Sequence, residues 1–375
     1  MTVLIKEVKS KSDIKQFVDF QFELYKDSKF WVPPVKASEK ESLMPEKNPA
    51  FDFCDARFFL AFKNDRCVGR IGAIINKAYN EKTGQKFGRI NRIEFIDDAE
   101  VFEKLIDTAI EWFREQKMEY VHGPLGFTNL DTQGLLIDGF DYMPSIASVY
   151  HLPYFKEHFA RLGFEKENDW IEFRLTITEA PLNKAKRGAE IVKKRYGVDV
   201  VSFTSRAELK PYSKRVFEIL NDAFQYLPYV SPLNEKMIKL YSDKYFNILN
   251  PRFVKVVVKD NEPVGFFVGL PSLSEAMQKA GGSLFPFGFI HVLKALKKPQ
   301  VIDMLLTGVL QDYQSAGIAV ILISELQSEM MKAGITTLET TGIFETNQNV
   351  ITNWKNYEHI QHKRRRCYVK KITVE

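Results

Sequence analysis

The sequence contains an internal repeat, and this repeat limits the chain to a fold that is built twice. Residues 63–69 (KNDRCVG) and 259–265 (KDNEPVG) share a polar turn between two apolar runs, and each segment follows an Arg-Phe pair. A polar turn between two strand-like runs is typical of a β-hairpin. Similarity at a large separation along the chain indicates that one structural unit has been used twice.

The elements that follow the two hairpins occur in the same order. In each half a strand precedes an amphipathic helix, whose apolar residues lie on one stripe, and a second strand, a short helix and a β-rich tail follow. The predicted strands are 88–96 and 120–125 in the first half and 301–310 and 336–343 in the second, and the predicted short helices are 153–164 and 349–360. We therefore predict an α/β (α+β) protein with two tandem lobes, each a mixed, mostly antiparallel β-sheet flanked by helices.

The predicted lobes are residues 1–178 and 200–375, joined by a basic helical connector at 179–199. The second lobe carries a long insertion at residues 271–299, and long insertions in compact domains often cover a site. Its Phe-rich part is expected to be a buried helical insertion, with an interfacial helix or a lid as the alternatives.

Composition excludes several functional classes. The 375 residues include 53 Lys and Arg against 48 Asp and Glu, and a net charge of +5 is too small to indicate attraction to nucleic acid or to a membrane surface. No apolar run reaches the ~18 residues that a membrane span requires, and the amino terminus lacks the pattern of a signal peptide. Three scattered cysteines give no disulfide framework. A cytoplasmic location is expected.

Two further patterns contain side chains that can bind ligands. His359 and His362 are separated by two residues, but no third residue stands at a convincing ligand spacing, so no metal site is predicted. The basic run at residues 363–366 is predicted to be a charged edge strand, which resists aggregation, with contact to a cofactor's 3′-phosphate as the alternative.

Residues 311–326 (QDYQSAGIAVILISEL) begin a helix with very little side-chain bulk, as at Ser315, Gly317 and Ala319. The first turn of a helix has unpaired N–H groups and a partial positive charge, so it can bind phosphate where no bulky side chain blocks the approach. Ser315 can add a hydroxyl donor and Gln314 an amide. The alternative is that Ser315 is an ordinary N-cap and that the small residues only allow close packing on a sheet.

The corresponding helix of the first half begins differently. Asp97-Asp98-Ala99-Glu100 resembles a capping box, in which the protein's own carboxylates accept hydrogen bonds from the free N–H groups. A pyrophosphate there would meet negative charges, at a cost on the order of 1 kcal/mol for each close exposed pair. We therefore expect only the second half to bind a phosphorylated cofactor.

Residues 309–319 resemble the pyrophosphate-binding segment of the GCN5-related N-acetyltransferases (GNAT proteins), in which Arg or Gln is followed by x-x-Gly-x-Gly or Ala. Gln314, Gly317 and Ala319 occupy these places, between a predicted strand and a predicted helix. This segment is moderately specific, and the order of the surrounding elements adds to the resemblance.

Two further motifs are similar to those of the same family. Asn347 with Trp354 resembles the family's later Asn and Tyr pair, and Phe159-x-x-x-Gly163-Phe164 resembles its terminal Tyr-x-x-x-Gly-Phe. The chain is therefore similar over nearly its whole length to a tandem protein with two GNAT-like lobes.

The resemblance implies an acyl-CoA-dependent N-acyltransferase, such as an N-acetyltransferase, that uses acetyl-CoA or another acyl-CoA and acts on a small-molecule or peptide amine. The pyrophosphate is expected on backbone N–H groups at the helix start, and the pantetheine arm beside the end of the preceding strand. There the amide of Val309 or Leu310 would polarise the thioester carbonyl. The expected cofactor-binding residues are Gly308, Val309, Leu310, Gln314, Ser315, Ala316, Gly317, Ile318, Ala319 and Asn347.

Acyl transfer to an amine also needs a base that removes a proton from the attacking nitrogen. Glu339, on the strand after the cofactor helix, is the first candidate, and Glu345 and Asp303 follow it, although each also suits a solvated or ion-paired carboxylate. The resemblance implies a tyrosine that protonates the leaving thiolate, and Trp354 stands at its usual place. Tyr357, one turn later, is the candidate substitute, with a packing tyrosine as the alternative.

The long loop of the first half contains Asn129 and Asp131, which are candidates for orienting the acceptor. The alternative is that both are Asx-turn residues that hold the loop.

Other functions stay open at this point. The resemblance extends to enzymes with tandem lobes that transfer from aminoacyl-tRNA, and replacement of the expected tyrosine by Trp354 also suits a non-catalytic ligand-binding protein. Peripheral membrane attachment through Phe285, Phe287 and Phe289 is a third possibility. The sequence does not indicate an oligomeric state.

Overall fold

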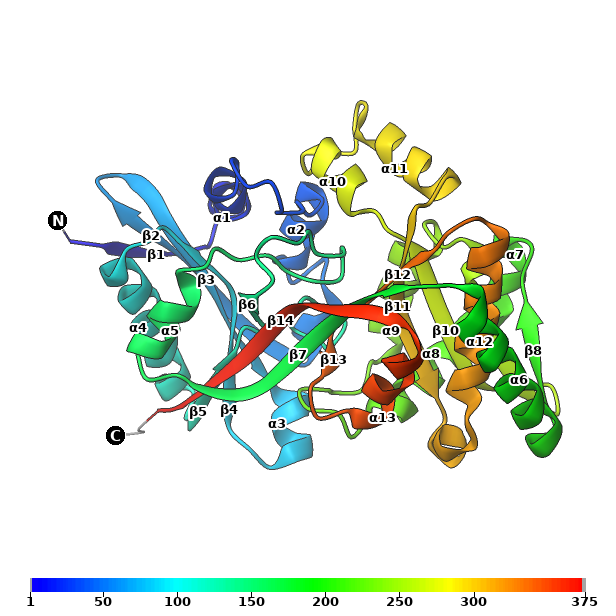
Figure 1. Cartoon of the computed structure of the whole chain (residues 1–375). Coiled ribbons are helices and arrows are strands. Elements are labelled where there is room, and N and C mark those ends of the chain that lie inside the picture. Colours follow the sequence, from blue (N-terminus) through cyan, green and yellow to red (C-terminus); the bar gives the residue numbers. More distant parts are fainter. Residues whose placement is uncertain (1, 373–375) are drawn as a thin grey trace. The chain divides into compact units, whose positions relative to one another are not determined.

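The computed structural model describes residues 2–372, which form two compact units. The N-terminal unit consists of residues 1–171, 274–291 and 363–375, and the C-terminal unit consists of residues 172–273 and 292–362. Each unit therefore combines segments that are far apart in the sequence. Both β7 (Glu165–Thr176) and β14 (Glu358–Lys371) contribute residues to each unit (Figure 1).

The N-terminal unit is a mixed sheet in the order β1-β2-β3-β4-β5-β14, and all neighbours are antiparallel except β4 and β5. Its other elements are β1 (Leu4–Glu7), α1 (Lys11–Leu24), α2 (Lys36–Ser42), β2 (Cys54–Lys63), β3 (Arg66–Asn76), α3 (Lys77–Thr83), β4 (Phe87–Phe95), α4 (Ala99–Glu115), β5 (Tyr120–Gly123), β6 (Leu135–Asp138), α5 (Phe155–Arg161) and α10 (Ser274–Ala280).

The C-terminal unit repeats this plan in the order β7-β12-β11-β10-β9-β8, and here only β11 and β12 are parallel. Its elements are α6 (Glu179–Tyr196), β8 (Val198–Ser202), α7 (Arg206–Leu209), α8 (Ser213–Phe224), α9 (Glu235–Phe246), β9 (Val254–Lys259), β10 (Glu262–Pro271), β11 (Val301–Val309), α12 (Ile318–Lys332), β12 (Thr337–Thr340), β13 (Ile343–Phe344) and α13 (Gln348–Ile351). Helix α11 (Gly288–Lys297) has residues in both units. The predicted fold class is confirmed.

The two predicted hairpins are β2-β3 and β9-β10, and their turns have the same backbone conformation. Asn64 and Asp65 have φ of 52° and 60°, and Asp260 and Asn261 have φ of 50° and 67°. Positive φ at both central residues defines the type I′ turn, whose twist matches that of paired strands and which Asn and Asp tolerate well. The turn chemistry of the repeat therefore sets both hairpins.

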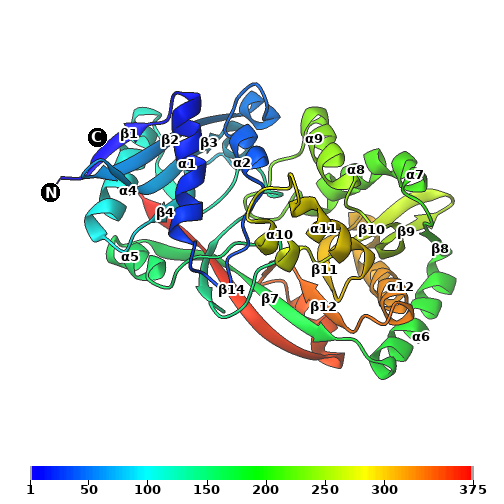
Figure 2. The ribbon, with the colours of Figure 1, turned by 90° about the horizontal axis from the view of Figure 1, so that it is seen from above.

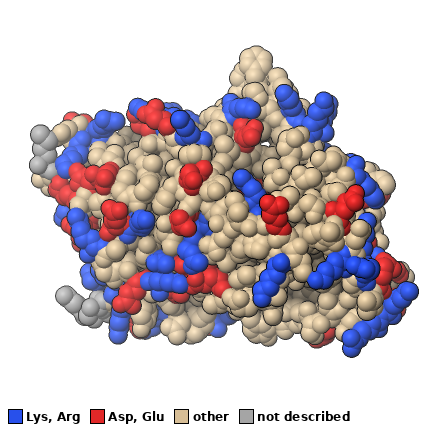
Figure 3. Space-filling view, in the orientation of Figure 1, with Lys and Arg blue, Asp and Glu red and all other residues tan. Residues whose placement is uncertain are grey.

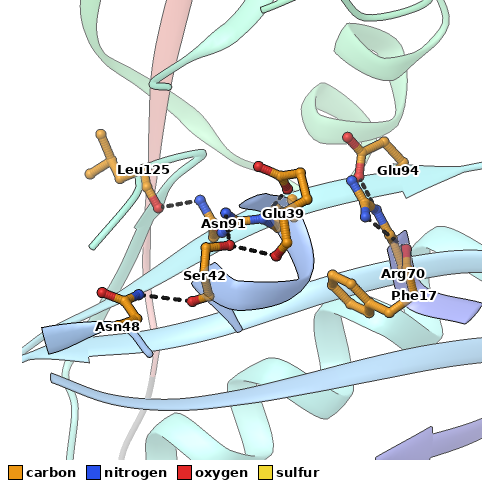
Figure 4. Close-up of polar contacts among 9 residues, drawn as sticks. Phe17, Glu39, Ser42, Asn48, Arg70, Asn91, Glu94 and Leu125 are labelled. Atoms are coloured by element: carbon orange, nitrogen blue, oxygen red, sulfur yellow. Dashed lines mark hydrogen bonds and ion pairs between the residues drawn. The ribbon is translucent and has the colours of Figure 1, made fainter. Parts of the chain in front are cut away.

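Opposite faces of the N-terminal sheet are covered by α4 and α1. A Cβ on Gly69 would lie 2.8 Å from Leu105 of α4, whereas the neighbouring Arg70 donates to the carbonyl of Phe17 in α1. Successive residues of a strand point to opposite faces, so the two helices lie on different sides. Arg70 is buried and pairs with Glu94 at 2.6 Å, which satisfies its charge beneath α1 (Figure 4).

The C-terminal sheet has the same arrangement. Gly265 and Gly269 lie against Ile318 and Leu326 of α12, and α6 packs beside α12 on this face (Figure 2). Helices α8 and α9 are associated with the other face, on which the side chain of Phe266 lies. The predicted connector is thus a helix that packs on α12, with Leu182 and Ala189 buried.

The strand before the main helix carries a β-bulge in each unit. In the N-terminal unit the register of β3 against β4 shifts between the pairs Arg70↔Glu94 and Gly72↔Asn91. In the C-terminal unit it shifts between Val268 and Gly269, which leaves Leu305 of β11 as the extra residue. Bulges redirect side chains and often occur beside active sites.

Two expectations about single segments are wrong. The predicted helix at 349–360 is shorter, because α13 and a 3₁₀ turn (Thr352–Asn356) end before β14 begins at Glu358. The basic run at 363–366 is not an edge strand, because β14 pairs with both β5 and β6. Lys363 and Arg365 are buried and donate to the carbonyls of Met143 and Gln133, and Arg364 and Arg366 both pair with Asp169.

The expectation of a buried helix in the second insertion is also wrong. No residue of α11 is buried, and Phe285 and Phe287 are 78% and 71% exposed. Among the described residues no helix has the length and apolar character needed to span a bilayer.

Asp98 is the N-cap of α4, as the sequence predicts, and its removal tests how much the cap contributes. Its side chain accepts from the N–H groups of Glu100 and Val101, and the pKa of Asp98 is lowered, chiefly by its hydrogen bond from Lys63. We expect Asp98→Ala to lower the free energy of unfolding by about 1 kcal/mol at pH 7.

The pH dependence gives the control for this variant. Because the folded pKa is lowered, the stabilisation is present above the unfolded value of about 3.9 and disappears as the pH falls through the lower folded value. Urea unfolding followed by tryptophan fluorescence reports mainly on this unit, which holds three of the four tryptophans, Trp31, Trp112 and Trp170. A loss that is equally large at pH 2.5 would contradict the assignment.

Candidate active site in the C-terminal unit

The parallel ladder between β11 and β12 is short. Four residue pairs, from Val301↔Thr337 to Met304↔Thr340, are in register, and the hydroxyl of Thr341 then donates to the carbonyl of Met304 at 3.0 Å. Beyond this point β11 continues to Val309 and pairs only with β10 on its other side. The two strands therefore part beside the bulge at Leu305.

This separation decides which amides of β11 face the gap. The N–H of Leu310 donates to the carbonyl of Val264 at 2.9 Å, so it serves the ladder with β10. In an antiparallel pair alternate residues direct their amides to opposite neighbours, and Val309 therefore directs its N–H away from β10. Of the two amides predicted to polarise a thioester, Leu310 is occupied and Val309 faces the gap.

Helix α12 is the next α-helix after this strand, and no side chain of a described residue caps its first N–H groups. A 3₁₀ turn (Gln311–Ala316) follows β11, and Gly317, with φ of 80°, is the N-cap of α12. Ser315 lies in the turn and is exposed, so the alternative that it is an ordinary N-cap is wrong. The side-chain amide of Gln314 donates to the carbonyl of Val309 at 3.3 Å, which ties the turn to the end of the strand.

The corresponding helix start in the N-terminal unit is occupied by carboxylates. Asp98 caps α4, and Lys63 neutralises both Asp98 and Glu100 at 2.8 and 3.1 Å. The first turn of α12 contains no acidic residue, and at the beginning of the preceding turn the N–H of Gln311 donates to Asp222 Oδ2 at 3.0 Å. The two helices thus follow the same kind of strand but offer different electrostatics to an anion.

A row of charged side chains crosses the sheet where β11 and β12 are still paired. Asp303 lies opposite Glu339, and Glu339 lies opposite Arg174 of β7. Side chains directly opposite on neighbouring strands project from the same face. Asp303 and Glu339 are 1% and 6% exposed, and Arg174 donates to Glu339 Oε1, with its Nε at 2.7 Å.

His362 completes this row, and the sequence analysis did not predict its role or that of Arg174. Its Nε2 lies 3.7 Å from Glu339 Oε2, and its Nδ1 lies 3.1 Å from the carbonyl of Glu172. Arg174 and Glu339 are 165 positions apart in the sequence, and His362 and Glu172 are 190 positions apart. No local sequence pattern could have indicated these contacts. Glu339 is therefore an ion-paired strand carboxylate, as one alternative stated, with an imidazole beside its second oxygen.

An apolar pocket lies on the same face of the sheet. It lies between helices α7, α8 and α9 and strands β9, β10 and β11. Phe266 and Val268 line it, and Leu270, two residues further along β10, is opposite Asp303. Because every second residue of a strand shares a face, the charged row and the pocket lie on one side of the sheet. The lining residues are Phe203, Leu209, Tyr212, Ser213, Val216, Phe217, Leu220, Tyr241, Ser242, Tyr245, Phe246, Leu249, Val254, Val256, Phe266, Val268, Leu305 and Leu306.

The remaining candidates of the second half have structural partners. The hydroxyl of Tyr357 donates to Gln327 of α12 at 2.9 Å, and burial raises the pKa of Tyr357. Tyr357 therefore has the buried, hydrogen-bonded position that is expected of a packing tyrosine. Trp354 is buried beside it, and Asn347 accepts from the N–H of Val350 as the N-cap of α13.

The acceptor candidates Asn129 and Asp131 belong to the N-terminal unit. Asp131 Oδ2 accepts from the N–H of Thr128 at 3.0 Å, and the N–H of Asp131 donates back to the carbonyl of Thr128. These bonds hold the loop, as the Asx-turn alternative describes for Asp131, whereas the buried Oδ1 of Asn129 accepts no hydrogen bond from the described residues and does not form such a turn. The carbonyl before this turn, on Phe127, accepts from Asn76, which ties the loop to the end of β3.

One cluster in the N-terminal unit has the composition of a metal site. His122, Glu167 and Cys367 bring one possible ligand atom each within 4.8 Å of one another. Glu167 Oε2 lies 3.3 Å from both the imidazole Nδ1 and the thiol sulfur, so the carboxylate contacts both other groups. Burial lowers the pKa of His122, and the buried guanidinium of Arg89 acts in the same direction. A nearby fixed positive charge opposes a cation here.

Two curated relatives match the chain over nearly its whole length. Protein YghO of Escherichia coli is 30% identical over 376 residues, which cover 98% of this chain and 95% of YghO. A protein named bacterial ceramide synthase from Caulobacter vibrioides is 26% identical over 383 residues, covering 97% and 96% of the two chains. No protein-family model matches the chain.

Solved structures share the fold at low sequence identity. A tandem GNAT protein from the clavulanic acid biosynthesis pathway is 12% identical, with a TM-score of 0.57 and coverage of 98% of both chains. A GCN5-related N-acetyltransferase from Sphaerobacter thermophilus is 11% identical, with a TM-score of 0.50 and coverage of 98% and 95%. The chain therefore belongs to the family of Escherichia coli YghO, and its fold is the tandem GNAT fold that the sequence predicted.

Proposed function

We propose that the protein is an acyl-CoA-dependent N-acyltransferase whose reaction joins an acyl group to the amine of a substrate with a long hydrocarbon chain. The observation that carries the proposal is one face of the C-terminal sheet, where an apolar pocket and a row of buried charged side chains lie together. An amphipathic substrate needs both kinds of surface.

The donor half of the proposal is supported by the start of α12. This helix of 15 residues has neither a capping side chain nor an acidic residue in its first turn, so no carboxylate of the turn competes with a pyrophosphate for its N–H groups. The residues proposed to hold the donor are those of the turn and first helical residues, Gln314 to Ala319, with the pantetheine arm in the gap between β11 and β12. The N–H of Val309 faces this gap.

The acceptor half is supported by the pocket and by one relative. Ceramide is chemically an amide between a fatty acid and a long-chain amino alcohol, and the Caulobacter relative is named a ceramide synthase. The pocket of this chain suits one such hydrocarbon chain, because its lining is almost entirely apolar and adjoins the charged row at Leu305 and Leu306. The pocket and the relative together support an amphipathic amine as the acceptor, among the small-molecule and peptide amines that the sequence left open.

The proposed step forms one C–N bond and breaks one C–S bond. The amine nitrogen attacks the thioester carbon while the Val309 N–H donates to the developing oxyanion. Glu339, with Asp303 beside it, accepts the proton that the nitrogen loses, and Arg174 holds Glu339 in place. Coenzyme A leaves as the thiolate and takes up one proton, and the product is an amide.

The pocket assignment predicts a dependence on chain length. We expect thiol release from acyl-CoA to need an amphipathic amine, and the variant Val216→Trp, which fills the pocket from α8, to raise KM at least about tenfold for the long-chain substrate only. Ile191→Trp adds the same bulk at a side chain that is 67% exposed and is the matched control. Varying the donor chain and the acceptor chain separately shows which one the pocket receives. The assignment would be contradicted if the rate of thiol release did not depend on the chain length of the acyl donor or of the amine acceptor in either variant.

The donor site predicts an electrostatic effect on coenzyme A binding. We expect Ser315→Glu, which places a carboxylate in the exposed turn before α12, to weaken binding about tenfold in calorimetry. Ala333→Glu makes the same charge change at the other end of α12 and should bind as the unmodified protein does. Equal affinities for both variants, or no binding at all, would count against the proposed donor site.

The proposed base predicts a defect in kcat rather than in binding. Glu339→Gln should lower kcat by about 100-fold or more and leave the affinity for coenzyme A unchanged. Glu345→Gln changes a carboxylate that is only part-buried and should keep full activity. A kcat within twofold of normal in Glu339→Gln would exclude the base role.

A second class of function, transfer from aminoacyl-tRNA, has less support. On the face drawn in Figure 3, basic and acidic side chains of the described residues are interspersed rather than gathered in a basic groove. Thiol release without any nucleic acid in the assay separates the two functions.

A further inference from the structure

The segment that ends in α11 exposes an unusual amount of apolar surface. Nine large apolar side chains among the described residues are exposed, and five of them lie between residues 285 and 293. They are Phe285, Phe287, Phe289, Ile290 and Leu293, with exposures of 78%, 71%, 38%, 51% and 50%. A concentration of this kind marks an interaction surface, whereas scattered exposed apolar residues are ordinary.

The backbone that carries these side chains is well fixed within the segment. The hydroxyl of Ser283 donates to the carbonyl of Phe285 at 2.7 Å, and the N–H of Phe289 donates to the carbonyl of Leu284 at 2.7 Å. The preceding residues are anchored to the N-terminal unit, where the carbonyl of Gly282 accepts from the N–H of Lys36. The aromatic rings are therefore presented outward by an ordered loop and helix.

The charges within the segment that carries the apolar residues have one sign. From Ala276 to Ile302 the sequence has no Asp or Glu, and it contains Lys279, Lys294, Lys297 and Lys298. Lys279 pairs with Glu275, which directly precedes this stretch, at 3.6 Å, so the cations relevant here are the other three lysines. In Figure 3 the uppermost tan surface, where Figure 1 labels α10 and α11, adjoins blue side chains on both sides and a red one on the left. Lys294 and Lys297 lie in the last turns of α11 and Lys298 follows the helix, so exposed apolar and basic side chains lie on the same short segment.

We infer that residues 283–298, the α11 segment, dock on the surface of a bilayer that contains anionic lipids. Aromatic and branched apolar side chains that enter the interface, flanked by lysines and lacking carboxylates, are the composition of an interfacial helix. Each lysine near an anionic surface adds on the order of 1 kcal/mol of attraction, which complements the apolar burial. A protein partner with a buried apolar interface would not require the exclusion of carboxylates over 27 consecutive residues.

This inference does not rest on the proposed acyl transfer, and a sedimentation assay tests it separately. The full chain is mixed with vesicles of phosphatidylcholine alone or of phosphatidylcholine with phosphatidylglycerol. We expect the protein to sediment with the phosphatidylglycerol vesicles, and Phe285→Asp/Phe287→Asp to reduce the bound fraction at least about tenfold. Lys294→Gln/Lys297→Gln/Lys298→Gln should remove the preference for the anionic vesicles.

The matched control places two aspartates at other exposed apolar positions. Leu4→Asp/Ile191→Asp changes side chains that are 66% and 67% exposed and should sediment as the unmodified protein does. No sedimentation with anionic vesicles, or an equal loss in both double variants, would overturn the inference. Self-association of the unmodified chain that Phe285→Asp/Phe287→Asp abolishes, without vesicle binding, would overturn it in favour of a second copy.

Discussion

The early end of the β11-β12 ladder is the constraint on which the C-terminal unit depends. Four paired residues hold the strands together from Val301 to Met304, and the bulge at Leu305 then redirects β11. Backbone amides of a buried strand need hydrogen-bond partners, and on one side of β11 the strand β10 supplies them as far as Val309. On the other side β12 pairs only as far as Met304, and beyond it β11 faces a gap. The charged row lies just before this gap, and the apolar pocket begins at the bulge.

The two units show how one plan can serve different purposes through a few side chains. Both have an I′ hairpin, a bulged strand and an amphipathic helix in the same order. The difference lies at the helix start, where Asp98 occupies the N–H groups of α4 and Gly317 leaves those of α12 without a side-chain cap. A glycine N-cap in place of a capping side chain costs a helix only a few tenths of a kcal/mol. The start of α12 can therefore leave its N–H groups without a side-chain acceptor at little cost in stability.

Much of the fold could be predicted from the sequence because its signals are local. The polar turns at 63–69 and 259–265 set both hairpins, and the apolar stripes of α4 and α12 set the main helices. The site could be predicted only where it depends on consecutive residues, as at the start of α12. Arg174 and His362 contact Glu339 because the strands that carry them lie together in the fold. These residues are far apart in the sequence, so their spacing does not predict the contacts.

Two errors have a common physical origin. The basic run in β14 was expected to face solvent because it is charged, yet buried Lys363 and Arg365 are satisfied by backbone carbonyls. The segment of α11 was expected to be buried because it is apolar, yet its side chains are exposed. Composition alone therefore does not predict burial. A charged side chain can be buried where backbone carbonyls accept its hydrogen bonds, and an apolar side chain can be exposed.

A crystal structure of the chain with bound coenzyme A tests the central claim most directly. The account predicts pyrophosphate density over the first turn of α12, at Gly317 to Ala319, and the pantetheine arm between β11 and β12 with the sulfur directed toward Glu339. Density for the nucleotide over Asp98 at the start of α4, or nucleotide binding at neither helix, would contradict it.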